Sequence, residues 1–356
     1  MTLQQAVVQP SGTHAARRAD PVRVWLFAVA ALVFALVSVG GATRLTGSGL
    51  SITEWQPIIG VVPPLSDGAW HEAFEKYRQI PQYTHVNRGM SLEAFKRIFW
   101  WEWTHRFLAR LIGVVFLVPF LFFLATGRIS RALLPRLAGL LTLGGLQGAI
   151  GWYMVRSGLA DRIDVSQYRL ALHLSLALLI FAGLLWTALS LGARRLDAGG
   201  LLPAQRRTAA LVVGLIFLQI VAGAFVAGLK AGAGYNTWPL MDGRLVPDGL
   251  GVMSPWWINL FENATTVQFN HRILAYALLA VVLLHVWSML MRTGDRLMRA
   301  SALALAGTTV GQAALGIWTL LAHVPLSLGL AHQAGAVVVF GSALWHLHLV
   351  QPQRDD

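Results

Sequence analysis

Four histidines at repeated positions are the residues of this sequence best placed to do chemistry. His105 and His271 open the segments "HRFLAR" and "HRILAY", each at the start of a long apolar run. His173 and His332 each have a phenylalanine eight residues later and a tryptophan thirteen residues later. Two neutral imidazoles on facing helices of a bundle are the usual way to hold heme iron within a membrane. The repeated pairs therefore favour two heme sites, one in each half of the chain.

Zinc is a weaker interpretation of the same histidines. Structural zinc sites need four ligands and catalytic sites three, usually with a carboxylate or thiolate, whereas each half offers one histidine pair. The chain has no cysteine, which excludes disulfides, thiolate ligation and iron–sulfur clusters built on it. A single histidine at a helix end is most often an interfacial residue, but four related ones inside apolar segments indicate function. The histidines without such partners are interpreted as structural: His14, His71, His85, His285, His323, His346 and His348.

The residues around the four histidines fit the heme interpretation. Arg106 and Arg272 follow the first histidine of each half, and guanidinium groups bind carboxylates such as heme propionates in a bidentate way. Anchoring to a lipid phosphate is an equally strong alternative for both arginines. Glycines on the third and seventh apolar segments leave room for a flat macrocycle or for close helix packing. They are Gly144, Gly148, Gly151, Gly311 and Gly316.

One carboxylate distinguishes the two halves. Glu102 precedes His105 by three residues, so both side chains share a helix face, and the matching residue before His271 is Gln268. The two side chains have nearly one shape, but only glutamate takes or gives a proton. This difference favours an arrangement in which one heme is chemically modified and the other only carries electrons. A structural ion pair between Glu102 and Arg106, four residues later, is an almost equal alternative on spacing alone.

Membrane-spanning helices must position these residues. Hydrophobic residues make up 56% of the 356 residues and charged residues 12%, and the mean hydropathy is +0.58, which soluble domains rarely approach. Apolar runs long enough to cross a bilayer occur at 23–43, 106–126, 137–155, 170–192, 208–229, 271–291, 300–321 and 329–349. The first 22 residues resemble neither a signal peptide nor an organelle transit peptide. The sequence therefore predicts an all-α integral protein of a bacterial inner membrane with eight transmembrane helices.

The net charge of +12 reflects topology rather than nucleic-acid binding. With eight spans, both termini lie on one side, and the short loops on that side are dense in arginine. These arginines are Arg17, Arg18, Arg23, Arg128, Arg131, Arg136, Arg194, Arg195, Arg206, Arg207, Arg292, Arg296, Arg299 and Arg354. The positive-inside rule then places both termini in the cytoplasm and the four histidines near the periplasmic side.

Internal repetition divides the chain into two four-helix halves. The segments "QGAIGW" at Gln147 and "QAALGIW" at Gln312 follow the first histidine of each half at nearly equal distances. Because each half has an even number of spans, the halves form a parallel repeat about an axis along the membrane normal. The predicted parts are a cytoplasmic tail (1–22), an N-terminal half (23–195) and a C-terminal half (206–350).

The N-terminal half contains a long outer loop, residues 44–104. Two amphipathic helices are predicted within it, in "SDGAWHEAFEKYRQI" and "SLEAFKRIFWWEW". Ser66 or Asp67 caps the first helix and Ser91 the second. Their aromatic faces indicate that both lie at the outer membrane interface.

The sequence resembles the heme A synthase family, in the longer, cysteine-free alphaproteobacterial form that is related to the mitochondrial enzyme. The resemblance covers residues 20–350, and its most specific stretches are "GGATRLTGSGLSITEW", "EWTHR" (102–106), "AGAGYNTWPLM", "FNHR" (269–272) and "LAHQAGA" around His332. Some family members carry a cysteine pair in an outer loop. This chain has none, so a redox role for such a pair does not apply to it.

The resemblance implies an oxidoreductase, acting on a CH or CH2 group, that supplies the cofactor of terminal oxidases. It oxidises a methyl group of heme O to the formyl group of heme A by successive hydroxylations followed by loss of water. Carried over, His271 and His332 ligate a heme b cofactor, with Arg272 as a candidate for its propionates. The long first loop is expected to close over, or admit, the farnesyl-bearing substrate.

The N-terminal half then holds the substrate. His105 and His173 ligate heme O, Arg106 is a candidate for its propionates, and Glu102 is the catalytic carboxylate. Glu102 would transfer protons or stabilise cationic character at the oxidised methyl group. The Glu102/Gln268 difference between the halves agrees with that assignment.

Two other functions are compatible with the histidine pairs. A di-heme b, quinol-linked electron-transfer cytochrome would use both hemes as permanent carriers. A heme transporter or chaperone would release its porphyrin unmodified, and it is disfavoured because transport needs no second, fixed iron. The family further implies a partnership with heme O synthase, the farnesyltransferase that makes heme O. The electron acceptor or donor is not identified by the sequence, and homo-oligomerisation is left open.

Overall fold

The computed structural model describes residues 20–56, 59–160, 162–192 and 203–351, and within these ranges it is helical without a strand. The long helices are α1 (Pro21–Leu45), α4 (Leu92–Ala125), α5 (Leu134–Leu159), α6 (Gln167–Ser190), α7 (Pro203–Gly228), α9 (Ala264–Arg292), α10 (Arg296–Leu321) and α11 (Leu326–Val350). The short helices are η1 (Ile59–Val61), α2 (Asp67–Arg78), α3 (Pro81–His85), η2 (Ala231–Ala233), η3 (Trp256–Ile258) and α8 (Asn259–Glu262). The junction predicted between the two halves lies largely outside the described residues.

Length and composition make this a multi-pass membrane protein. Seven of the long helices in the described ranges are long and apolar enough to cross a membrane, and α5 is the long helix outside that set. Its 26 residues suffice for a span, but its glycines and the polar Gln147 lower its hydropathy. Seven of the eight expected spans are therefore supported by composition, and the eighth rests on the length and position of α5.

The second span differs from the prediction. A separate surface helix was expected over "SLEAFKRIFWWEW", but α4 is one continuous helix of 34 residues. Ser91 caps it and Ser66 caps α2, both as predicted, each accepting a hydrogen bond from a backbone N–H three residues later. No proline or glycine stands between Leu92 and His105 to break the helix. His105 consequently lies about four turns inside α4 rather than in its first turns.

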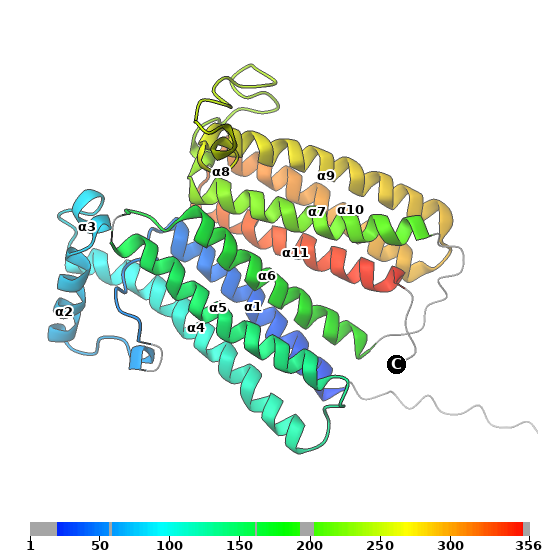
Figure 1. Cartoon of the computed structure of the whole chain (residues 1–356), viewed down its shortest axis with the longest axis horizontal. Helices are drawn as coiled ribbons and strands as arrows, with labels where there is room; N and C mark the ends of the chain where they lie inside the picture. Colours follow the sequence, from blue (N-terminus) through cyan, green and yellow to red (C-terminus); the bar gives the residue numbers. More distant parts are fainter. Residues whose placement is uncertain (1–19, 57–58, 161, 193–202, 352–356) are drawn as a thin grey trace, which may run out of the picture.

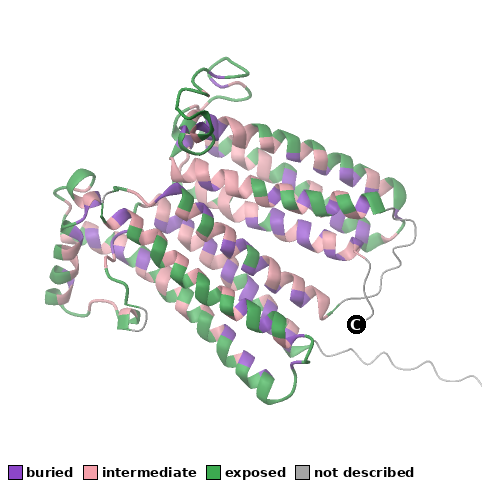
Figure 2. Ribbon diagram, in the orientation of Figure 1, coloured by how far each residue is buried: buried purple, intermediate pink, exposed green. Residues whose placement is uncertain are grey.

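The long helices form two groups of four (Figure 1). In the first group, α1 and α5 each pack against both α4 and α6, and in the second, α7 and α10 each pack against both α9 and α11. The helices that carry the four histidines therefore stand at opposite corners of their groups. Buried apolar residues of both groups form one continuous core. Figure 2 shows where the buried residues lie along the long helices.

The two groups meet through α1 and α6 on one side and α7 and α11 on the other. Gln333 of α11 donates to the backbone carbonyl of Val37 in α1 at 2.6 Å. It passes over Gly41, where an added Cβ would stand 2.4 Å from its Oε1. The close approach of these helices therefore requires glycine at this position.

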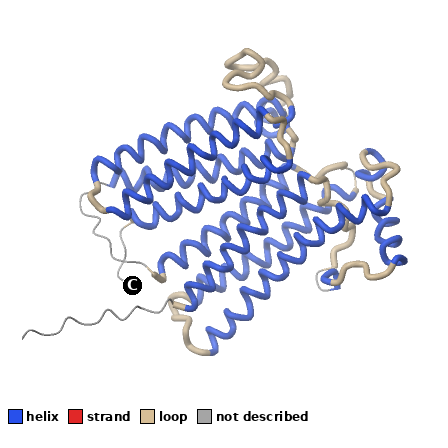
Figure 3. The backbone as a smooth tube through the Cα atoms, turned by 180° about the vertical axis from the view of Figure 1, so that it is seen from behind, coloured by secondary structure: helices blue, strands red, loops and turns tan. Residues whose placement is uncertain are grey.

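The first long connection has a small core of its own. Trp70 and Tyr77 of α2 pack with Phe95 of α4 and with Leu50, in a cluster separate from the main core. Burial raises the pKa of Tyr77, so at neutral pH its hydroxyl is protonated and donates to Gln82 at 2.9 Å. This connection and the one before α9 lie at the same end of the helices, as the view from behind also shows (Figure 3).

Candidate functional site

Each of the four histidine rings lies against a glycine of a neighbouring helix. The pairs are Gly40 in α1 with His105, Gly151 in α5 with His173, Gly223 in α7 with His271, and Gly316 in α10 with His332. A Cβ added at these glycines would stand 2.9, 3.0, 3.2 and 2.7 Å, respectively, from Cε1 of the histidine. Any side chain there would push the ring away. The glycines lie near the C-terminal ends of their helices, so all four histidines lie at one end of the bundle.

Three of the four rings are also held by a glutamine four residues before the glycine. Nε2 of Gln147, Gln219 and Gln312 donates to the backbone carbonyls of His173, His271 and His332 at 3.0, 3.1 and 2.7 Å. The same atom lies 3.1 to 3.2 Å from Nδ1 of the ring. Glutamine and glycine together form a seat that fixes both the backbone and the ring of the histidine.

The seat of His105 is incomplete. The residue four positions before Gly40 is Leu36, which has no polar side chain, and Nδ1 of His105 is buried without a hydrogen-bond partner. The main chain of Leu36 lies beside this ring as the main chain of Gln219 lies beside His271. The positions are therefore equivalent, and the difference between them is confined to the side chain.

Glu102 is buried and fully engaged. One carboxylate oxygen accepts from the Ser51 hydroxyl and from the Ile52 N–H, both at 2.8 Å. The other accepts from Nε and Nη2 of Arg106 at 3.1 and 2.6 Å. Nη1 and Nη2 of Arg106 also donate to the backbone carbonyls of Glu54 and Ile52. The structural ion pair weighed from spacing therefore exists, and it ties the start of the outer loop to α4.

The C-terminal half repeats this arrangement, but Gln268 stands in place of the carboxylate. Nη2 and Nη1 of Arg272 donate to the backbone carbonyls of Tyr235 and Thr237 at 2.7 and 2.8 Å. Gln268 donates to the same Tyr235 carbonyl at 3.0 Å. Within the described ranges no carboxylate accepts from Nε of Arg272, which is buried without a partner there, whereas Nε of Arg106 donates to Glu102.

The donor set fits a heme in each half. Each half presents two imidazoles from opposite corners of a four-helix group, and a neutral imidazole is a common axial ligand of heme iron. Added Cβ atoms at Gly144, Gly148 and Gly311 would meet nothing within 4 Å, so these positions leave space, whereas Gly151 and Gly316 serve close contact with the histidines. The unpaired Nε of Arg272 is a buried donor that suits an anionic group.

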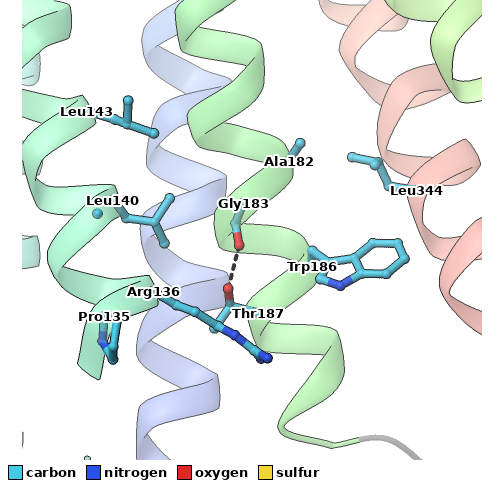
Figure 4. A pocket seen from close by; sticks show the side chains of 10 residues that line it. Pro135, Arg136, Leu140, Leu143, Ala182, Gly183, Trp186, Thr187 and Leu344 are labelled. Atoms are coloured by element: carbon cyan, nitrogen blue, oxygen red, sulfur yellow. Dashed lines mark hydrogen bonds between the residues drawn. The ribbon is translucent and has the colours of Figure 1, made fainter. Parts of the chain in front are cut away.

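Two cavities lie outside the histidine pairs. One of about 280 Å³ separates the outer loop from α4 and is lined by Arg106, Trp103 and Lys76 among others. The other, of about 460 Å³, is an apolar groove between α5 and α6 (Figure 4). Gly183 in this groove stands about 15 Å along α6 from His173. Neither cavity is lined by any of the four histidines.

Sequence reasoning missed part of the seats. It used Gln147 and Gln312 only as markers of the repeat and did not single out Gln219, Gly40 or Gly223. The signal is nevertheless in the sequence, as a glutamine four residues before a glycine in "QGAIG", "QIVAG" and "QAALG", with "LVSVG" at the fourth site.

The chain is similar to known proteins over most of its length. The model of a family described as cytochrome oxidase assembly protein matches residues 23–344. A heme A synthase of Parvibaculum lavamentivorans is 57% identical over 324 residues, covering 91% of this chain and 92% of that protein. A heme A synthase of Chelativorans is 54% identical, covering 95% and 94%, and one of Azorhizobium caulinodans is 55% identical, covering 93% and 95%.

Proposed function

Because the chain belongs to the cytochrome oxidase assembly protein family, we propose that it is a heme A synthase, which oxidises a methyl group of heme O to the formyl group of heme A. The observation that carries this proposal is the identity of 57% over 91% of the chain to a protein of that name. The repeated histidine seats are consistent with it. The names of the relatives do not favour the di-heme electron-transfer cytochrome.

The proposed architecture is eight transmembrane helices in two parallel repeats of four, residues 23–195 and 206–350. The helix packing supports it, because exchanging α1, α4, α5 and α6 for α7, α9, α10 and α11 reproduces every close pair within the two groups. The contact between α6 and α7 likewise becomes that between α11 and α1. The arginine-rich short loops support cytoplasmic termini in a bacterial inner membrane, with the histidines towards the periplasm.

The proposed assignment of the two hemes follows the family resemblance, and the difference between the halves agrees with it. His271 and His332 are proposed to ligate a resident heme b, which would accept and pass on single electrons when bound. His105 and His173 are proposed to hold the substrate heme O. Arg272 keeps a free buried donor for a propionate, whereas most donors of Arg106 are already used by Glu102 and the loop.

Glu102 is proposed as the catalytic carboxylate. It lies one turn from His105 and has a hydroxyl, that of Ser51, within 2.8 Å as a route for a proton. Its four hydrogen bonds fix the carboxyl group in place, where it could stabilise positive charge or take part in proton transfer. Heme O synthase is proposed as the partner that delivers the substrate.

The proposed function is tested by purifying the protein from a host that supplies heme O, then identifying its extracted hemes by chromatography and mass. Heme b together with heme O, its hydroxylated intermediate or heme A is the expected result. Two equivalents of heme b alone, despite available heme O, would favour the electron-transfer cytochrome instead.

A further inference from the structure

The four histidine seats are not equivalent, and the exception falls in the half proposed to hold the substrate. His271 and His332, the proposed ligands of the resident heme, are each held by a glutamine, Gln219 and Gln312. His173 is held by a glutamine as well. Of the four, His105 alone lacks this contact in the described structure.

A side chain that holds a ligating histidine fixes the orientation of its ring, and loss of such a partner commonly costs about tenfold or more in metal affinity. Here the amide nitrogen of each glutamine donates to the backbone carbonyl of the histidine and lies against its ring, so the contact acts through orientation. At His105 the position that would supply the partner is Leu36, as the register of Gly40 and Gly223 establishes. The glycine contact and the adjacent main chain of Leu36 remain, so the ring has a defined place, but no side chain holds it. Nδ1 of His105 is buried without a hydrogen-bond partner in the described structure, at the place where a glutamine lies beside the other three histidines.

We propose that Leu36 is a positioning residue that leaves His105 a weak ligand, so that the heme of the N-terminal half exchanges while the heme between two restrained histidines stays. The proposal rests on the proposed function, because an enzyme whose substrate and product are both hemes must release one heme and retain the other. A glutamine at position 36, as at the three equivalent positions, would have made both sites equally retentive.

The test exchanges the residues at the two equivalent positions. Wild type, Leu36→Gln and the matched reverse variant Gln219→Leu are purified with their hemes from a host that supplies heme O. Excess apomyoglobin then captures released heme, the release is followed by absorbance, and the hemes left behind are identified by mass.

Wild type is expected to release its hemes in a fast and a slow phase. Leu36→Gln should slow the fast phase about tenfold and leave the slow phase unchanged, and Gln219→Leu should accelerate the slow phase by about the same factor. A single turnover of bound substrate in Leu36→Gln should keep its rate while steady-state turnover falls, because release is slowed and the chemistry is not.

The proposal is overturned if wild type releases both hemes at one rate, or if the fast phase in folded Leu36→Gln equals that of wild type. Should Leu36→Gln not fold, an unchanged slow phase in Gln219→Leu overturns it equally. The proposed function is contradicted by a different result. If the heme that leaves fast is heme b and no heme O is found, the unequal binding of the two hemes is supported but the heme A synthase assignment is wrong. If heme O leaves at a rate indifferent to residue 36, the assignment stands and the role of Leu36 falls.

Discussion

Replacing Glu102 with glutamine separates its two roles, anchoring the outer loop and moving protons. The carboxylate accepts four hydrogen bonds, two from Arg106 and two from Ser51 and Ile52. Glutamine has one acceptor oxygen, so its amide nitrogen must face either Arg106 or the Ile52 N–H. A buried N–H without a partner costs about 1–3 kcal/mol, and neutralising the partner of Arg106 adds a similar amount.

The expected loss of stability from Glu102→Gln is therefore about 2–6 kcal/mol. Loss of a general acid or base lowers the rate by about 10²- to 10⁴-fold, which corresponds to about 3–5 kcal/mol in the activation free energy. The two effects are of similar size but differ with temperature. A protein that has only lost its loop anchor recovers turnover well below its unfolding midpoint, whereas a protein without its proton-transfer group does not.

The assay measures conversion of bound heme O to heme A in a single turnover, at a temperature where the heme spectrum of the variant matches that of wild type. Glu102→Gln should retain both hemes and lose at least about 100-fold in rate. The control is Glu93→Gln on the same helix, where an exposed carboxylate pairs with Lys96 and its loss should change neither property. Turnover of Glu102→Gln within a few fold of wild type would refute a catalytic role and leave the carboxylate as a loop anchor.

Three further substitutions test other parts of the structure. Gly316→Ala places a Cβ 2.7 Å from the His332 ring and should reduce heme b content at least about fivefold, whereas Gly307→Ala on the same helix meets nothing within 4 Å and should not; equal heme contents in the two variants would contradict the seat. His271→Ala should remove the low-spin heme b spectrum and the activity together, so an active variant without that spectrum would exclude this heme from the reaction. Tyr77→Phe removes a buried hydroxyl that donates to one side chain and accepts from another, and should destabilise the outer loop by about 1–2 kcal/mol, seen as faster proteolysis of residues 46–91 at unchanged heme content.

The helical class, the positions of the long helices and the placement of the four histidines at one end of the bundle could be predicted from the sequence, because they depend on hydropathy and on a repeat that is visible in the residues. The pairing of the histidines around two hemes stays a prediction. It failed at the junction of the outer loop and the second span. Hydropathy falls upstream of Arg106, which suggested a break, but helical structure continues wherever no residue interrupts its hydrogen bonds, and none does between Leu92 and Arg106. A helix can therefore leave the apolar environment of the membrane without ending there.

The histidine seats lay beyond sequence reasoning for another reason. A glycine or glutamine in an apolar helix has many roles, and which side chain it meets depends on how neighbouring helices are rotated against each other. The ion pair of Glu102 and Arg106 could be foreseen from spacing within one helix, but the Ser51 and Ile52 donors come from a loop about fifty residues away. Contacts of this kind need the assembled structure.

The adjacent glycines of α1 link the two halves mechanically. Gly40 receives the ring of His105, and Gly41, the next residue, receives Gln333, the neighbour of His332. Since consecutive residues of a helix point about 100° apart, one turn of α1 is clamped from two directions and cannot rotate to relieve either contact. Displacement of α11, which carries one proposed heme ligand, His332, is therefore expected to reach the seat of another proposed ligand, His105. The two four-helix groups are mechanically coupled through this turn of α1. We therefore do not expect them to function when they are expressed as separate fragments.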